Sequence, residues 1–249
     1  MRRPLGVIFD LGDTLLRTTA TDWAAGSARL LALANDSRGI TAADIKALSD
    51  EIANEVFSAR EESALELHYG DFIKLLCETL GISLKIDYVE AAREMWRAAV
   101  TMAPTEGVLV VLEALRASGV RMGVLSNSAF PGVVLADELE RHAMGRFFLF
   151  VISSADYGLR KPHRRIVDLV VKKMEVRPDD IWFVGDKLDF DVAGAVNSGL
   201  CPIWYNPSRR PRTGSYQCLE VGHWHEFRDK VETLCGSSLT QRKEAGDGA

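Results

Sequence analysis

The stretch 5–15, with the sequence LGVIFDLGDTL, constrains the fold more than any other part of the chain. Its first five residues are mostly apolar, which is typical of a short buried strand, and the run stops at Asp10 and a turn containing Gly12. In an open parallel sheet, the carboxyl ends of the strands border the ligand crevice. We therefore predict that Asp10 is a reactive group, although taken alone an Asp in this place is more often a turn residue.

Three later segments deliver polar residues in the same way, each at the end of an apolar run or in an adjacent loop. They are Ser126 and Asn127 after residues 120–125, Lys161 before a proline, and Asp186 and Asp191 after residues 181–184. Any one of these patterns is common. Four of them in order, separated by helical stretches, form a specific signal.

The ordered set resembles the motifs of the haloacid dehalogenase-like (HAD) hydrolase superfamily. These motifs are a nucleophilic Asp after the first strand, a Ser or Thr after the second, a Lys, and a Gly-Asp pair followed by another acidic residue. The resemblance covers about residues 5–205. It implies a Rossmann-like core with a small helical cap. It also implies a phosphatase-type activity, namely that of a phosphoric monoester hydrolase.

Periodicity predicts the same architecture. Strands alternate with helices from residue 107 to 205, among them a strand over 147–152 and a helix over 192–198. This alternation indicates an α/β fold with a doubly wound parallel sheet. Between the first and second motifs the apolar residues follow helical spacing, over residues 23–34, 41–60, 65–80 and 87–102. We therefore expect an all-helical cap domain at 17–104, hinged at 16–21 and 102–107, inserted in a core formed by 1–16 and 105–235. Residues 236–249 have no apolar periodicity and are predicted to be a flexible tail.

Composition excludes several classes of protein. With 47% hydrophobic and 26% charged residues, the 249-residue chain is an ordinary globular one. A net charge of −5, with basic residues dispersed apart from a cluster at 209–212, gives no nucleic-acid footprint, and we interpret that cluster as a solvated loop. No apolar run approaches the ~20 residues of a membrane span. The four cysteines are widely spaced, so we expect reduced thiols and a cytoplasmic protein that has no nucleic-acid or membrane partner. The oligomeric state stays open.

The motif residues suit phosphoryl transfer. A carboxylate such as Asp10 can attack phosphorus to form an aspartyl phosphate, and the charge on the phosphoryl oxygens then needs cations and donors around it. Lys161 supplies a positive charge and Ser126 a hydroxyl. The residues predicted to contact the phosphate are Asp10, Thr14, Ser126, Asn127 and Lys161.

A Mg²⁺ cofactor is expected at the same place. This hard ion takes a few carboxylate or carbonyl oxygens and leaves its other positions to water and substrate phosphate. The Asp10 and Asp186 carboxylates and the Gly12 carbonyl fit that need, and Asp191 is added either as a ligand or as a group that orients a metal-bound water or Lys161.

Position 12 departs from the family pattern. Most phosphatases that the chain resembles have a second Asp two residues after the nucleophile, which protonates the leaving alcohol and then activates water. Here that position is Gly12, and the neighbouring carboxylate, Asp13, lies one residue further on. Acid–base assistance is typically worth ~10² to 10⁴ in rate, so its loss weakens hydrolysis without preventing nucleophilic attack.

Two alternatives to a phosphatase of small phosphorylated metabolites follow from this departure. One is a dehalogenase-type hydrolase, because family members of that kind also lack the second Asp, but Asp186 and Asp191 would then have no purpose. The other is a weakly active member that binds a phosphorylated ligand or a protein partner. Substrate identity is beyond the sequence; the large or polar cap residues that are candidates for specificity are Trp23, Arg60, His68, Tyr69 and Trp96.

Overall fold

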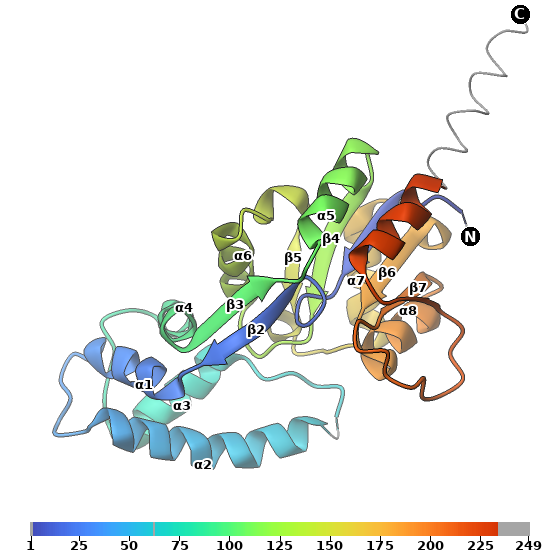
Figure 1. Ribbon diagram of the computed structural model, residues 1–249. Coiled ribbons are helices and arrows are strands. Elements are labelled where there is room, and N and C mark those ends of the chain that lie inside the picture. The colour runs from blue at the N-terminus through green and yellow to red at the C-terminus, as the bar shows by residue number, and fades with distance from the viewer. Residues whose placement is uncertain (1, 62, 234–249) are drawn as a thin grey trace, which may run out of the picture.

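The computed structural model describes residues 2–61 and 63–233. Its centre is a six-stranded parallel sheet in the order β5-β4-β1-β6-β7-β8 (Figure 1). The strands are β1 (Gly6–Phe9), β4 (Arg121–Ser126), β5 (Val151–Ser153), β6 (Ile181–Gly185), β7 (Cys201–Tyr205) and β8 (Leu219–Val221). The strand order runs outward in both directions from β1. The carboxyl end of β1 is therefore the switch point at which a crevice opens in a doubly wound sheet.

Helices cover both faces of this sheet, as the alternating side chains of β1 require. Val7 and Phe9 belong to an apolar cluster with helices on one face, whereas Ile8 belongs to a second cluster on the other face. The first face is covered by α5 (Val108–Ala117), α6 (Gly132–Arg141) and a terminal helix at 224–233, and the second by α7 (Arg164–Met174) and α8 (Ala193–Asn197). The predicted doubly wound α/β core is confirmed.

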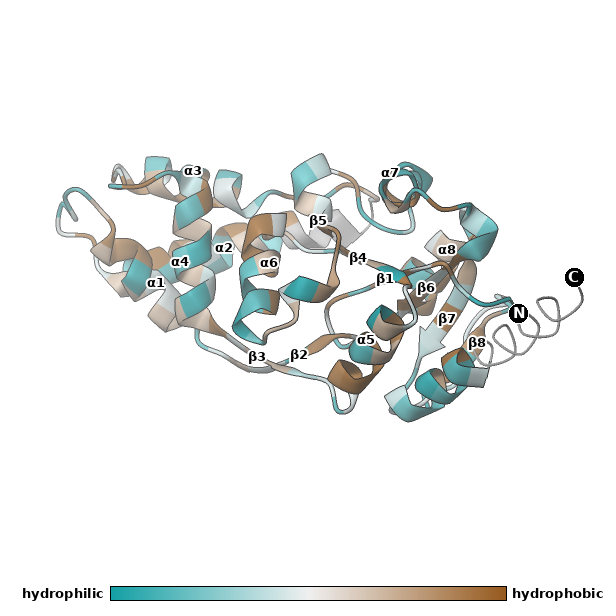
Figure 2. Ribbon diagram, turned by 90° about the horizontal axis from the view of Figure 1, so that it is seen from above, coloured by the Kyte–Doolittle hydropathy of each residue, from teal (hydrophilic) through white to brown (hydrophobic). Residues whose placement is uncertain are grey.

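Four helices form the cap inserted after β1. They are α1 (Trp23–Ala32), α2 (Ala42–Glu61), α3 (Tyr69–Leu80) and α4 (Tyr88–Ala99). The first turn of α2 is closed by a capping box, in which the Thr41 backbone N–H donates to the Asp44 carboxylate and the Asp44 N–H donates to the Thr41 hydroxyl. Seen from above, these helices occupy one end of an elongated molecule and the sheet occupies the other (Figure 2).

The two connections between cap and core are strands, which the sequence did not predict. β2 (Leu16–Thr21) and β3 (Val100–Pro104) pair antiparallel and form a ribbon between the two parts (Figure 1). The pairing satisfies the backbone of both connections at once. The insertion is thus helical where helices were expected, and its predicted hinges form a two-stranded ribbon.

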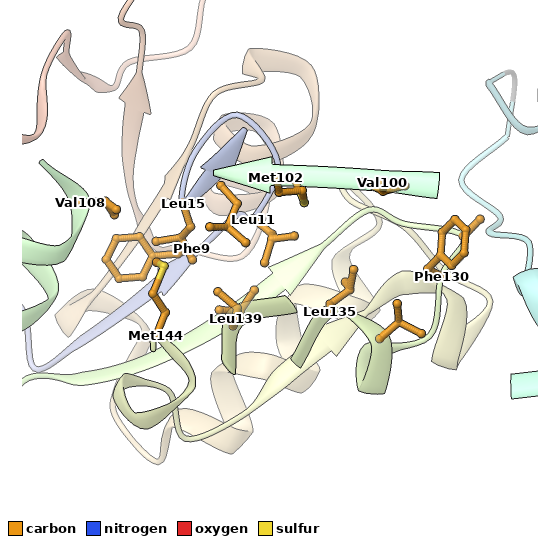
Figure 3. Close-up of a cluster of buried hydrophobic side chains, with 14 of the residues drawn as sticks. Phe9, Leu11, Leu15, Val100, Met102, Val108, Phe130, Leu135, Leu139 and Met144 are labelled. Carbon is orange, nitrogen blue, oxygen red and sulfur yellow. The ribbon is translucent and has the colours of Figure 1, made fainter. Parts of the chain in front are cut away.

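Apolar packing continues from the core towards the cap. Leu11 and Leu15, which follow β1, lie beside Met102 of β3, and Leu135 of α6 extends the same cluster towards Phe130 (Figure 3). These side chains are buried. Because one cluster contains residues of both parts, the cap is packed on the core rather than tethered to it.

A second link joins the cap to the loop that precedes Lys161. The Glu66 backbone N–H donates to the Gly158 carbonyl at 3.0 Å, and the Arg160 N–H donates to the Ala64 carbonyl at 3.0 Å. The buried Glu66 carboxylate also accepts a hydrogen bond from the Ser154 hydroxyl and lies 3.7 Å from the Arg160 guanidinium. The segment after α2 therefore forms part of the wall beside the motif lysine.

Several boundaries differ from prediction. The strand expected at 147–152 begins later, as β5, after a 3₁₀ turn at Gly145–Phe147; the helix expected at 192–198 is preceded by a π-helical turn, Leu188–Val192. β8 was not predicted. The tail predicted at 236–249 lies outside the described residues. Among the helices that the structure describes, none combines the length and apolar character needed to cross a membrane.

Candidate active site

Asp10 lies at the floor of a cavity at the carboxyl end of β1. Its backbone N–H donates to the Val184 carbonyl of β6 at 2.8 Å, which fixes the residue at the strand end, and its side chain is 10% exposed. The cavity has a volume of about 250 Å³. Among the predicted site residues it is lined by Asp10, Gly12, Ser126, Asn127, Lys161, Asp186 and Asp191. Side chains from four separate parts of the sequence thus meet here.

Lys161 is buried against the predicted nucleophile. Its Nζ lies 2.6 Å from Asp10 Oδ1 and 2.7 Å from Asp191 Oδ1, and it donates to the Leu125 carbonyl at 2.9 Å. The side chain is 1% exposed. Two hydrogen bonds, to Asp10 and Leu125, and an ion pair with Asp191 therefore fix the position of this charge.

Asn127 holds the loop that carries Lys161. Its Nδ2 donates to the Lys161 carbonyl at 2.9 Å, and its Oδ1 accepts from the Lys161 N–H at 2.7 Å. The amide of Asn127 is thereby used within the protein, which makes it a positioning residue. The hydroxyl of the neighbouring Ser126, by contrast, has no hydrogen-bond partner within 2–61 and 63–233 and is available to a ligand in the cavity.

Asp186 and Asp191 come from the end of β6 and the turn that follows it. Together with Asp10 they offer three carboxylate oxygens within 4.8 Å of one another. Asp191 uses both of its oxygens inside the protein, because Oδ2 accepts from the Lys187 backbone N–H at 2.9 Å while Oδ1 contacts Lys161. Of its two predicted roles, the geometry therefore favours orientation of Lys161 over direct binding of a metal.

Asp186 is surrounded by positive charge. Its Oδ2 lies 3.0 Å from Lys187 Nζ and 3.3 Å from Arg210 Nη2. Its backbone carbonyl accepts from Arg210 Nη2 at 2.6 Å and from the Trp204 indole at 3.0 Å. One oxygen of Asp186 and one of Asp10 have no hydrogen-bond partner in the described part of the chain.

The charges in this cavity perturb one another. Burial raises the pKa of Asp10 to about 7; Lys161 opposes this shift, and the Asp191 and Asp186 carboxylates reinforce it. Burial disfavours the charge on Lys161, but Asp10 and Asp191 together raise its pKa. Among the described residues, the buried Lys161 therefore faces Asp10 and Asp191, whereas the buried Asp186 contacts the partly exposed Lys187 and Arg210.

The donor set suits a hard divalent cation. Asp10 and Asp186 each retain a carboxylate oxygen without a hydrogen bond, both are buried, and Gly12 lines the same cavity. Oxygen donors with room for water and phosphate are what Mg²⁺ prefers. The residues present therefore fit the expected metal, with Asp10, Asp186 and Gly12 as the residues that would hold it.

Two of the predicted contacts look different in the structure. Thr14 is fully buried, does not line the cavity, and its hydroxyl oxygen has no partner among the described residues. Gly12 does line it, and a Cβ built there would meet no atom within 4 Å. The backbone at this position therefore leaves room for the carboxylate that the family pattern usually places there.

Sequence reasoning missed Arg160 and Lys187, which line the cavity and directly adjoin motif residues. Their position beside Lys161 and Asp186 was the available signal. Asp13, already named as the carboxylate next to Gly12, also lines the cavity, with a positive φ of 56°. Arg210 belongs to a basic cluster that was interpreted as a solvated loop, and that interpretation is wrong because Arg210 contacts Asp186.

The cap residues proposed for specificity separate into different roles. Trp23 and Tyr69 line a second cavity, described below. His68 begins α3, where its Nδ1 accepts from the Gly70 N–H at 3.1 Å, and the Trp96 indole donates to Glu138 at 3.0 Å. The side chain of Arg60 lies outside the described part of the structure.

Comparison with known proteins assigns the family. A model of haloacid dehalogenase-like hydrolases matches residues 5–199. The fold and the cavity define a capped hydrolase with a Rossmann-like core and a carboxylate at the end of its first strand. The chain belongs to the haloacid dehalogenase-like hydrolase family.

Similar proteins include both phosphatases and dehalogenases. A glyceraldehyde 3-phosphate phosphatase of Methanothermobacter thermautotrophicus is 28% identical over 244 residues, which are 96% of this chain and 97% of the relative. A solved HAD phosphatase from Thermococcus onnurineus gives a TM-score of 0.62 at 21% identity and covers 93% of this chain and 98% of its own. A 2-haloacid dehalogenase from Pseudomonas syringae gives 0.61 at 20% identity, with coverage of 94% and 99%. At these identities the two structural likenesses establish the fold.

Proposed function

We propose that this hydrolase is a Mg²⁺-dependent phosphatase that acts on small phosphorylated metabolites through an aspartyl phosphate on Asp10. The observation that carries the proposal is the state of the Asp10 carboxylate at the cavity floor: one oxygen is held by Lys161 at 2.6 Å, and the other has no hydrogen-bond partner in the described chain. A carboxylate held in this way presents its second oxygen to a ligand.

The reaction has two displacements. In the first, the free Asp10 oxygen bonds to phosphorus and the bond between phosphorus and the substrate's alcohol oxygen breaks. Because Gly12 has no acid group, the departing oxygen takes its proton from Asp13, from a water or from the substrate's own phosphate. In the second, water attacks the phosphorus, the bond to Asp10 breaks, and inorganic phosphate is released. The Ser126 hydroxyl donates to a phosphoryl oxygen, and Lys161 offsets the charge of Asp10 and of the phosphoryl group.

Asp10, Asp186 and Gly12 would hold the Mg²⁺ ion, which supplies positive charge to the phosphoryl oxygens when it is bound. Asp191 acts on Lys161 and not on substrate, because both of its oxygens are engaged within the protein. The similarity to the phosphatase of Methanothermobacter thermautotrophicus supports this proposal, because the match extends over 96% of the chain. Its name refers to glyceraldehyde 3-phosphate, a small phosphorylated metabolite of the class that we propose as substrate.

Gly12 favours the dehalogenase alternative, because enzymes of that type also lack the second Asp. A dehalogenase attacks carbon without a metal, however. The Asp10 and Asp186 carboxylates would then lie close together in this cavity with no metal ion to offset their negative charge. The same pair disfavours a ligand-binding protein without catalysis. We therefore retain the phosphatase as the proposed function.

A panel of phosphorylated metabolites, assayed for released phosphate with Mg²⁺ and with a chelator, tests the proposal. We expect Mg²⁺-dependent release from at least one ester and loss of turnover in Asp10→Asn, because the amide cannot attack phosphorus. Circular dichroism of the variant controls for folding. Residual activity of Asp10→Asn within tenfold of wild type would refute the nucleophile, and chloride release from a 2-haloacid without any phosphate release would favour the dehalogenase.

A further inference from the structure

A second cavity, of about 380 Å³, lies between the cap and the core. Its walls come from α1, α2 and α3 of the cap and from the loop after β4. Four aromatic side chains line it: Trp23, Tyr69, Phe72 and Phe130. The volume falls within the ~300–1,000 Å³ that is typical of small-molecule sites.

The aromatic rings in this cavity lie nearly parallel. The centroids of Tyr69 and Phe130 are 3.9 Å apart with an interplanar angle of 20°, and Trp23 is tilted only 16° from Phe130 at 6.3 Å. Such a stack presents ring faces of one orientation. A further planar ring can stack on it, because offset-stacked rings attract one another beyond the area that they bury.

Two polar atoms on these rings lack partners. Tyr69 is 6% exposed, yet its hydroxyl makes no hydrogen bond to any residue in 2–61 and 63–233. The Trp23 indole N–H is likewise without an acceptor there, whereas the indoles of Trp96 and Trp204 each donate to the protein. Neither atom belongs to the fully buried polar atoms that lack a partner, so both are accessible from the cavity and can bond to a ligand that enters it.

The lining also limits the charge of the occupant. The acidic side chain in the cavity lining is that of Asp50, whose Oδ2 lies 2.5 Å from Lys46 Nζ. The described lining residues include no Lys or Arg. An anionic group would meet no positive charge in this cavity. An uncharged planar group with hydrogen-bonding atoms at its edge fits both the ring faces and the polar atoms.

This cavity borders the candidate active site. Asn127 lines both cavities, and its side chain holds the backbone of Lys161. A phosphate ester with its phosphoryl group at Asp10 can therefore direct its alcohol portion past Asn127 towards the aromatic rings.

We propose that the cavity binds a planar heteroaromatic ring carried by the alcohol portion of the phosphate ester, as in a nucleoside 5′-monophosphate. The ring stacks on the faces of Tyr69 and Phe130, and its edge bonds to the Tyr69 hydroxyl and the Trp23 indole. This inference rests on the proposed phosphatase function and names the substrate class for it.

The test compares esters that differ in the ring and share a leaving group. Uridine, cytidine, adenosine and guanosine 5′-monophosphates are assayed beside ribose 5-phosphate, since all five release a primary alcohol. We expect kcat/KM for at least one nucleotide to exceed that for ribose 5-phosphate by about five- to a hundredfold, the range for a base stacked on an aromatic side chain. Values within threefold of ribose 5-phosphate for all four nucleotides would refute the inference.

Variants assign the preference to this cavity. Tyr69→Phe keeps the ring and removes the hydroxyl, so the ratio of kcat/KM between nucleotide and ribose 5-phosphate should fall about fivefold, the value of one hydrogen bond of typical strength. If Tyr69→Phe does not fold, Trp23→Phe replaces it: this variant removes the indole N–H, and the same ratio of kcat/KM values should fall. Tyr88→Phe, in α4 and outside the cavity lining, is the matched control and should leave the ratio unchanged. A ratio that neither cavity variant lowers would refute the assignment.

Calorimetry separates this inference from the proposed function. Titration of Asp10→Asn with the four nucleotides and with ribose 5-phosphate measures binding without turnover. Tighter binding of a nucleotide, lost in the Tyr69→Phe background, supports the ring site even if the wild-type protein hydrolyses no ester. Phosphate release from ribose 5-phosphate with equal binding of all five esters overturns the ring site and leaves the phosphatase function standing.

Discussion

Replacement of Gly12 by Asp tests whether the missing carboxylate limits the enzyme. A Cβ at this position would meet no atom within 4 Å, and the backbone φ of Gly12 is not among the positive values. A side chain at this position therefore starts in open space, on a residue that lines the 250 Å³ cavity. Positioned acid–base groups are typically worth ~10² to 10⁴ in rate. We expect Gly12→Asp to raise kcat/KM for alkyl phosphates by one to a few orders of magnitude.

The leaving group supplies the internal comparison. The anion of an aryl phosphate is stable enough to depart without a proton, whereas an alkoxide is not, so an acid at position 12 should help alkyl esters and leave aryl esters nearly unchanged. The assay measures both classes on wild type, on Gly12→Asp and on Gly12→Asn, an isosteric side chain that cannot transfer the proton. A gain in Gly12→Asn equal to that in Gly12→Asp would show that shape rather than acidity is responsible.

Asp13 offers the competing explanation. It lines the same cavity and adopts a left-handed backbone conformation, which Asp tolerates better than most residues. If Asp13 already donates the proton, wild type should hydrolyse alkyl and aryl esters at comparable rates, and Asp13→Asn should slow the alkyl esters selectively. Our reasoning about Gly12 is refuted if Gly12→Asp gives no gain on any alkyl phosphate.

Three further predictions concern the charges around the cavity. Burial raises the pKa of Asp10 to about 7, so the stability that its protonated form provides is complete below pH 3.8 and is lost as the pH rises from there through 7. The melting temperature of the metal-free protein should therefore fall more steeply between pH 3.8 and 7 than that of Asp10→Asn, and parallel curves would contradict the shifted pKa. Asp186→Ala should raise the Mg²⁺ concentration needed for half-maximal activity, and an unchanged titration would place the metal elsewhere. Arg210→Met should tighten Mg²⁺ binding up to about fivefold, as expected for removal of a half-exposed charge worth ~1 kcal/mol. Calorimetry measures this last effect, and Arg212→Met, which changes an arginine that pairs with Glu220, is its control.

The strand-end residues could be predicted because local sequence determines them. The apolar run before Asp10 must be buried, the chain must turn at Gly12, and parallel strands bring their carboxyl ends to one edge of the sheet. Asp10 and Asp186 therefore followed from runs of a few residues each, whereas Lys161 followed from the resemblance to the ordered family motifs.

Contacts that depend on long-range loop placement could not be predicted in this way. Arg210 reaches Asp186 because the buried Asn206 side chain bonds both the backbone N–H and the carbonyl of Arg210 and so folds the loop back. β8 has three residues with half-buried positions, too few for a periodic signal. The Trp23 and Tyr69 side chains were candidates because of their size, but only the tertiary fold, which brings the first residues of α1 and α3 beside the loop after β4, places them in one cavity.

The charge balance of the candidate active site argues for the cation that the proposal requires. Asp10, Asp186 and Asp191 bring three carboxylates into a space of 4.8 Å, and Lys161 is the buried ammonium among the described residues that faces them. Burial is the main cause of the raised pKa of Asp10, and the Asp191 and Asp186 carboxylates add to the shift. A phosphate ester adds further negative charge, which a buried site accepts only with added positive charge. Lys187 and Arg210 are partly exposed and already contact Asp186, so a divalent ion between Asp10 and Asp186 is the direct way to supply it. Substrate affinity should therefore depend on Mg²⁺ even in Asp10→Asn, which cannot turn over.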